Sequence, residues 1–173
     1  MDSTIALLII DVQMFGFESA NPVYESDQLI LKIGNLITQA RVARIPVIYV
    51  QHSEPEEAVG TPPWEIHSAI TPGAGEVIIQ KQHPDSFQDT NLQRELAAMG
   101  VKNLVIAGMQ TEYCIDTACR RAYSLGYNVT LVKDAHSTWN TDALTAAQII
   151  AHHNNVLSSW FVELKAADEI TFQ

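Results

Sequence analysis

The fold is decided by the stretch LVIAGMQTEYC at residues 104–114. Its apolar beginning, 104–107, predicts a buried strand that ends at Gly108. After a short connection, apolar residues recur at helical spacing over 115–125, and Gly126 is placed to cap that helix. The stretch therefore predicts a strand that passes through a tight connection into a helix.

The same alternation of apolar runs and helical stripes extends in both directions from this stretch. The predicted strands are 5–10, 47–50, 77–79, 104–107, 129–132 and an edge strand at 160–164. The predicted helices are 29–40 with Asp27 as its N-cap, 91–99, 115–125 and 141–154. Because apolar strands separated by helices form parallel sheets, we predict an α/β protein with helices on both faces of the sheet.

Length and composition limit the class of protein. The 173 residues, 47% of them hydrophobic, suit one domain over 1–173 that needs no disulfide or metal staple. A formal net charge of −10 argues against binding to nucleic acid or to anionic membranes. Residues 1–4 lack the basic start of a signal peptide and 5–10 is too short to span a bilayer, so we expect a cytoplasmic protein. Charged residues, at 17%, fall below the roughly 25% of typical domains, which favours buried subunit interfaces.

Polar residues follow the predicted strands at the points where they end. They are Asp11 after the first strand, Gln51 and His52 after the second, Lys81 after the third, 109–114 after the fourth and Asp134 after the fifth. In open parallel sheets, ligands bind beyond the carboxyl ends of the strands. We therefore expect these residues to gather along one edge of the sheet.

Cys114 is the most informative residue of that edge. A thiol at a helix N-terminus lies at the positive end of the helix dipole, which predicts a lowered pKa and a thiolate at neutral pH. The free N–H groups of the first helical turn also suit a developing oxyanion. The alternative is an inert cysteine that packs as a small hydrophobe. That reading fits Cys119, which falls on the apolar stripe of the same helix.

Asp11 and Lys81 complete a plausible reactive set with Cys114. Alone, Asp11 could cap a strand end and Lys81 could be an ordinary strand-end lysine. Together, an aspartate can take the thiol proton and a lysine can stabilise both thiolate and oxyanion. The combination is more specific than any of its members.

At this point the chain resembles the isochorismatase-like cysteine hydrolases. The matching segments are 7–13, Lys81 with Phe87, 108–114, 116–118, Ala122, 125–127 and 132–135, in the order and spacing of that family. The resemblance implies a Rossmann-like three-layer α/β/α fold with a six-stranded parallel sheet. It also implies an Asp11–Lys81–Cys114 triad that cleaves an amide-type C–N bond through a thioester.

The resemblance extends to the surroundings of the nucleophile. It implies a cis, non-proline peptide bond at Met109–Gln110, and an oxyanion hole formed by the backbone N–H groups of Gln110 and Cys114. Nicotinamidases of this family bind a metal through an Asp-x-His pair, but here Val50 stands where that Asp would be, two residues before His52. We therefore expect no metal and no cofactor, although His52, Glu54 and His67 offer suitable donor atoms.

The substrate-binding residues are predicted from their position near the reactive edge. Trp64 lies in the long irregular connection over 52–76, and Phe87 lies in the stretch after Lys81. Gln13 and His52 follow strand ends, where they can contact substrate. Two alternatives stay open: Gln13 can form hydrogen bonds within the loop, and Trp64 can lie in a subunit interface. The segment 109–114, together with Trp64 and the stretch 83–87, is most similar to metal-free family members such as streptothricin hydrolase. The acidic net charge does not predict the charge of the substrate, because a local pocket can oppose the global field.

Several alternatives stay open. One is vinyl-ether cleavage of an isochorismate-like substrate, against which the cysteine argues. Another is a redox-reactive thiol protein, which would lack a convincing resolving cysteine because Cys119 lies on the same helix. A nucleotide-binding module ranks last, since no glycine-rich phosphate motif is present. We expect a small-molecule substrate and a homo-oligomer, dimer or tetramer, with His136 supporting the site edge structurally.

Overall fold

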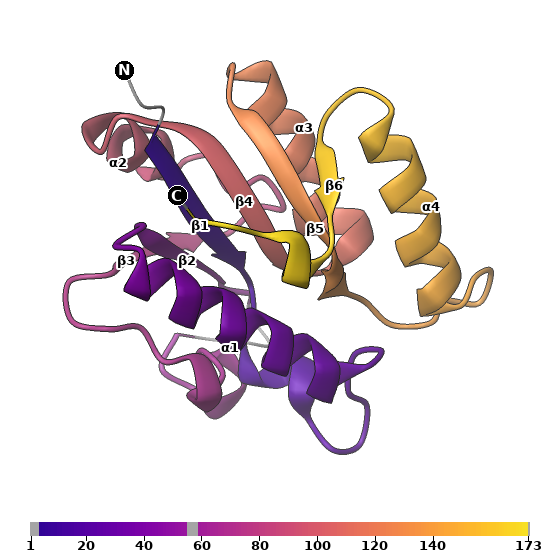
Figure 1. Ribbon diagram of the computed structural model, residues 1–173. Coiled ribbons are helices and arrows are strands. Elements are labelled where there is room, and N and C mark those ends of the chain that lie inside the picture. The colour runs from indigo at the N-terminus through magenta and orange to yellow at the C-terminus, as the bar shows by residue number, and fades with distance from the viewer. Residues whose placement is uncertain (1–3, 55–58, 173) are drawn as a thin grey trace.

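A six-stranded sheet forms the centre of the molecule in the computed structural model, which describes residues 4–54 and 59–172 (Figure 1). Its strands are β1 (Thr4–Ile10), β2 (Val47–His52), β3 (Val77–Lys81), β4 (Val101–Met109), β5 (Asn128–Ser137) and β6 (Glu163–Lys165). Every pairing is parallel, and the spatial order is β3-β2-β1-β4-β5-β6. The predicted fold class, including the parallel six-stranded sheet, is confirmed.

Helices cover both faces of this sheet, which gives three layers (Figure 1). On one face, α1 (Ser26–Val42) buries an apolar stripe that includes Leu29, Ile33 and Leu36. On the other face, α2 (Leu92–Ala98), α3 (Asp116–Ser124) and α4 (Ala146–Ser158) pack into a second apolar cluster. The central strand β1 is apolar along most of its length because both of its faces are covered.

Gly108 lets the two central strands lie against each other near the site. It pairs with Ile10 across the β1–β4 ladder and has a φ of 132°. A Cβ at this position would collide with the backbone oxygen of Ile10. Glycine is therefore required where β4 approaches β1 immediately before the chain turns toward Cys114.

Several element boundaries differ from the sequence prediction. The helix predicted over 141–154 begins at Ala146, because Thr145 and Gln148 form a capping box that fixes its start. The predicted edge strand 160–164 is displaced to Glu163–Lys165. Asp27 is not the N-cap of α1: Glu25 takes that place, and Asp27 lies in the first turn, where the helix dipole favours a carboxylate.

The order of the strands creates a crevice at one place. The chain runs outward from β1 through β2 to β3, and then returns to add β4, β5 and β6 on the other side of β1. The connections after β1 and β4 therefore diverge, and open α/β sheets bind ligands at such a point. Asp11 follows β1 directly, and Cys114 follows β4 by five residues.

Within the described residues, no helix has both the length and the apolar character needed to cross a membrane.

Candidate active site

Asp11, Lys81 and Cys114 meet in the crevice beyond β1 and β4. Asp11 is the first residue after β1 and has a positive φ of 53°, a conformation that aspartate tolerates better than most residues. Lys81 is the last residue of β3, and its side chain is completely buried. Cys114 lies in a π-helical turn, Thr111–Ile115, that leads into α3. Three elements distant in sequence thus bring the predicted triad together.

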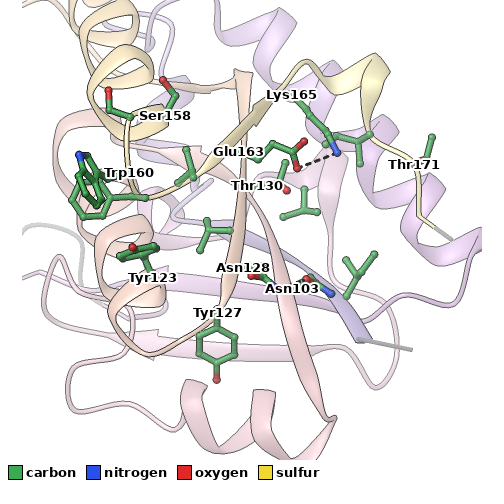
Figure 2. Close-up of a pocket in the computed structure, with 17 residues that line it drawn as sticks. Asn103, Tyr123, Tyr127, Asn128, Thr130, Ser158, Trp160, Glu163, Lys165 and Thr171 are labelled. Carbon is green, nitrogen blue, oxygen red and sulfur yellow. Dashed lines mark hydrogen bonds and ion pairs between the residues drawn. The ribbon is translucent and has the colours of Figure 1, made fainter. Parts of the chain in front are cut away.

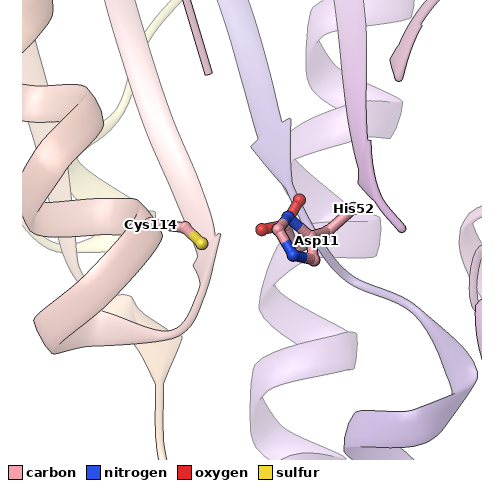
Figure 3. A group of neighbouring side chains, drawn as sticks. All are labelled: Asp11, His52 and Cys114. Atoms are coloured by element: carbon pink, nitrogen blue, oxygen red, sulfur yellow. The ribbon is translucent and has the colours of Figure 1, made fainter. Parts of the chain in front are cut away.

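The Lys81 ammonium group links the whole cluster. Its Nζ donates to Asp11 Oδ2 at 2.7 Å and to Cys114 Sγ at 3.2 Å. It also lies 2.9 Å from His52 Nδ1, and His52 pairs with Lys81 across the β2–β3 ladder. Three acceptors therefore match the three hydrogens of an ammonium group. Figure 3 shows the Cys114 thiol pointing from its turn toward Asp11 and His52.

His52 is held in one tautomer by its two neighbours. Since Lys81 donates to Nδ1, the hydrogen of the neutral ring lies on Nε2, and it donates to Glu54 Oε1 at 2.8 Å. His52 thus lies at the reactive edge of the sheet, and its contact with substrate stays a prediction. Its ring connects the buried lysine to an exposed carboxylate.

The thiol is protonated in this resting arrangement. Burial, followed by the negative charge of Asp11, raises the pKa of Cys114 to about 12, although Lys81 opposes the shift. The expectation of a lowered pKa and a thiolate at neutral pH is therefore wrong. The physical reason is that burial and the adjacent Asp11 carboxylate, neither of which is visible in the sequence, disfavour the thiolate.

A cavity of about 380 Å³ opens over the cluster. It is lined by Asp11, Phe15, His52, Glu54, Pro84, Gln110, Tyr113 and Cys114. Phe15, Pro84 and Tyr113 are not among the substrate-binding residues predicted from the sequence. Their positions carried a usable signal, because Phe15 follows Asp11 by four residues and Tyr113 directly precedes the cysteine.

Three of the predicted substrate-binding residues do not line this cavity. Gln13 is buried and ties strand ends together: its amide nitrogen donates to the carbonyl oxygens of His52 and Trp64, and its oxygen accepts from the His52 N–H. Trp64 donates its ring N–H to Ser53 Oγ at 3.0 Å. Phe87 is buried against Tyr127, with ring centroids 6.0 Å apart. For Gln13, this geometry favours the loop-bonding alternative.

The turn that carries the nucleophile is anchored from β5 and α4. The Met109–Gln110 peptide bond is cis, as the family resemblance implied. The buried Thr111 hydroxyl lies 2.9 Å from His136 Nδ1, and His136 Nε2 lies 2.9 Å from Asn154 Oδ1. Because the Asn154 oxygen can only accept, the ring hydrogen is on Nε2 and the Thr111 hydroxyl donates to Nδ1. Burial lowers the pKa of His136 to about 4, which keeps the ring neutral.

The donor atoms of the cluster do not fit a metal ion. Ligand atoms of Asp11, His52 and Cys114 lie within 4.8 Å of one another. However, the Lys81 ammonium contacts all three residues, so a positive charge already occupies their centre. His67, the third donor considered from the sequence, accepts a bond from the Ala69 N–H and packs against Phe17.

A larger cavity, of about 590 Å³, lies near the beginnings of β4 and β5 and beside β6 (Figure 2). Tyr123, Tyr127, Trp160 and the Glu163–Lys165 ion pair are among its lining residues. It contains none of the three predicted catalytic residues. The smaller cavity over Cys114 is therefore the candidate active site.

Known proteins with similar sequences and structures share this arrangement of elements. The family description "Isochorismatase domain" matches residues 5–159. Streptothricin hydrolase from Streptomyces noursei is 34% identical over 168 residues, which are 95% of this chain and 60% of that protein. Nicotinamidase 3 from Arabidopsis thaliana is 26% identical over 159 residues, covering 79% of this chain and 75% of that protein. A solved isochorismatase family protein has a TM-score of 0.90 at 34% identity, covering 94% of this chain and 98% of its own.

The chain is shorter than the curated streptothricin hydrolases that it matches. The chain spans 60% and 56% of the two curated streptothricin hydrolase sequences that it matches. The family match itself covers most of the chain, and the parallel sheet has the strand order described above. By sequence and by fold, the chain belongs to the isochorismatase family.

Proposed function

We propose that the protein is a cysteine amidohydrolase that cleaves a C–N bond of a small molecule through a thioester. The observation that carries this proposal is the buried contact of one lysine with both an aspartate and a cysteine. A nucleophile, a proton acceptor and a cation within hydrogen-bond reach are the parts that acyl transfer requires.

The first step is attack by Cys114 on the substrate carbonyl carbon. Because the thiol is protonated at rest, Asp11 takes the proton as the S–C bond forms. Asp11 Oδ2 accepts from Lys81, while Oδ1 has no hydrogen-bond partner among the described residues, so lone pairs remain for that proton. Lys81 keeps its positive charge beside the sulfur and the developing oxyanion.

The tetrahedral oxyanion is held by the backbone N–H groups of Gln110 and Cys114. The first N–H groups of a helix have no acceptor within the helix, and Cys114 lies in the first turn before α3. N–H groups fixed in place before the reaction stabilise charge that appears only in the transition state. The anchoring of Thr111 by His136 keeps this turn in position.

The second half of the reaction releases both products. Protonated Asp11 gives its proton to the leaving nitrogen as the C–N bond breaks, which leaves a thioester on Cys114 and an ionised Asp11. Asp11 then removes a proton from water as the water oxygen attacks the thioester. Collapse of that adduct frees the carboxylic acid and restores the Cys114 thiol with the proton that Asp11 had taken.

Two observations support amide chemistry over the alternatives. Streptothricin hydrolase and nicotinamidase are hydrolases by name, and nicotinamide is an amide. A redox-reactive thiol needs accessible thiolate, whereas Cys114 is protonated and Cys119 is completely buried on the apolar face of α3.

The test is release of amine or ammonia from a panel of small primary and secondary amides. We expect at least one to be hydrolysed, and we expect Cys114→Ala to lose activity roughly a thousandfold or more. Cys119→Ala is the matched control, because it removes a thiol from the same helix outside the cavity. Equal turnover by wild type and Cys114→Ala would overturn the proposal.

A further inference from the structure

We propose that the cavity selects positively charged substrates and rejects carboxylates, with Glu54 as the residue that determines this preference. The inference rests on the proposed function for its chemistry, since the selected molecule is the amide that reaches Cys114. It goes further by naming the charge of the substrate. The net charge of the chain could not decide this point, but the wall of the cavity does.

Among the residues that the structure describes, the cavity wall carries acidic but no basic side chains. Asp11 and Glu54 are the charged residues in that described part of the wall. The negative charge of Asp11 is balanced by Lys81 at 2.7 Å, with the lysine side chain fully buried. Within the part of the chain that the structure describes, the partner of Glu54 is the ring of His52, which is neutral in the tautomer that Lys81 imposes. The uncompensated charge facing an incoming molecule is therefore that of Glu54.

The basic groups on neighbouring segments are already paired with carboxylates. Arg120 binds Asp116 through two hydrogen bonds, at 2.8 and 3.1 Å. Arg121 lies 3.6 Å from Asp85, and His83 lies 3.4 Å from Asp89. A site built for a carboxylate usually presents an arginine or lysine for it, and neither is found among the lining residues within 4–54 and 59–172.

Aromatic rings in the same wall add to the preference for a cation. Phe15 lines the cavity and stacks on Trp139, with ring centroids 5.9 Å apart. Tyr113, beside the nucleophile, is 56% exposed. The face of an aromatic ring attracts a cation and repels an anion. The Glu54 side chain is 59% exposed, so it can contact a charged group while the reacting carbonyl lies deeper, at Cys114.

This charge preference also bears on the vinyl-ether alternative. Isochorismate is a dicarboxylate, and its binding would bring negative charge against Glu54, with no basic side chain among the described residues of the wall and Lys81 already paired with Asp11. Like charges within a few ångströms cost free energy in proportion to the inverse of their separation. A neutral or cationic amide meets no such penalty.

The charge preference can be measured without any turnover, by thiol-modifying reagents of different charge. The probes are three methanethiosulfonates: the anionic sulfonatoethyl, the neutral methyl and the cationic trimethylammonioethyl reagents. Each rate at Cys114, followed by peptide mass spectrometry, is divided by the rate of the same reagent with 2-mercaptoethanol. Taking ratios between reagents removes the effect of the thiol pKa, which is common to all three.

We expect the cationic reagent to react at least about tenfold faster than the anionic one, as a nearby uncompensated unit charge predicts. Glu54→Gln keeps an oxygen that accepts from His52 but removes the charge, and it should reduce this ratio about threefold or more. Glu163→Gln, on the far edge strand, changes the net charge by the same amount and should leave the ratio unchanged. High salt should bring the ratio of the cationic to the anionic rate closer to one in the wild type, because it screens the charge of Glu54.

The outcomes separate this inference from the proposed function. Equal rates, a faster anionic reagent, or a ratio that Glu54→Gln leaves intact would overturn the charge preference, whether or not amides are hydrolysed. If the ratio is as expected, a matched set of cationic, neutral and anionic amides should show the same order of kcat/KM. Hydrolysis that favours the anionic member would also contradict the inference, while leaving the amidohydrolase proposal intact.

Discussion

Lys81 places a fixed positive charge between an ionised aspartate and a neutral thiol. Its contacts with Asp11 and Cys114 are 2.7 and 3.2 Å long, in a site where its own side chain is inaccessible to solvent. Burial and the negative charge of Asp11 nevertheless keep the proton on the cysteine, because together they outweigh the opposing effect of Lys81 on the pKa. Such an arrangement protects the sulfur from oxidation and alkylation, since the thiolate is the reactive species.

This arrangement predicts an unusual response to Asp11→Asn. The Asp11 charge is one cause of the raised thiol pKa, and Lys81 opposes it. Removing the carboxylate leaves the ammonium free to stabilise thiolate, so the pKa of Cys114 should fall by about one unit or more. Alkylation by iodoacetamide near neutral pH should then be faster, while amide hydrolysis is lost.

The pH dependence of the alkylation rate measures this shift. Mapping by mass spectrometry separates Cys114 from Cys119, whose pKa is also raised by burial and which should stay unlabelled in the folded protein. An unchanged or higher pKa in Asp11→Asn would mean that the carboxylate does not act on the thiol.

At this scale, the sequence predicted which residues meet but not their protonation states. Asp11, Lys81 and Cys114 were predictable because each lies at or beyond the carboxyl end of a strand of a parallel sheet, and these strand ends share one edge. The pKa of Cys114 was not predictable, because it depends on burial and on distances that only the folded chain defines. Phe15 was missed for the same reason, since an aromatic residue next to a strand end can face either core or cavity.

Among the elements, α4 and β5 support the π-helical turn through a chain of three buried or half-buried side chains. Asn154 of α4 bonds His136 of β5, and His136 accepts from Thr111 of the turn. Asn154 is itself fixed, because its amide nitrogen donates to the Lys133 carbonyl. The nucleophile is thus positioned by elements that contribute no atom to the cavity wall.

The His136 link predicts a defined loss of stability in mild acid. Burial lowers the pKa of His136 from the ordinary 6.5 to about 4. Between these values the unfolded chain binds a proton that the folded chain does not, so stability falls as the pH falls from 6.5 toward 4. From pH 7 to pH 4.5 this group should cost about 2 kcal/mol of unfolding free energy.

Urea unfolding at the two pH values, in the wild type and in His136→Gln, isolates this contribution. The variant should be less stable at pH 7 but should lose about 2 kcal/mol less on acidification. His152→Gln serves as the control, because His152 is an exposed histidine on α4 and its removal should leave the acid response unchanged. If His136→Gln and wild type lose the same free energy, the buried ring is not the acid-sensitive group.

The elements themselves were predicted well where the pattern was long and poorly at their ends. The run at 5–10 and the helical stripe at 29–40 gave β1 and α1 because many apolar positions agree. The beginning of α4 was missed because the capping box at Thr145 depends on a side-chain contact with Gln148 rather than on hydrophobic periodicity. Gln13 was expected near the substrate because it follows a strand end, whereas its three bonds to backbone groups depend on the tertiary fold.

For the whole molecule, the strand order decides where chemistry is possible. The strand order reverses between β1 and β4, so the connections after these two strands leave the sheet in opposite directions and a crevice opens between them. The long connection between β2 and β3 brings Glu54 to the same cavity. The larger cavity beside β6 holds the exposed Trp160 and lies among the beginnings of the strands, away from this chemistry. A homo-oligomer and a cytoplasmic location stay predictions from the sequence.

The central claim is that Cys114 forms a covalent acyl intermediate within this fold. The most direct measurement is intact-protein and peptide mass spectrometry after rapid acid quenching during turnover of an amide from the panel. We expect a mass increase equal to the acyl group, located on Cys114, lost on hydroxylamine treatment and absent in Cys114→Ala. Turnover that proceeds in Cys114→Ala, or an acyl group found on another residue, would contradict it.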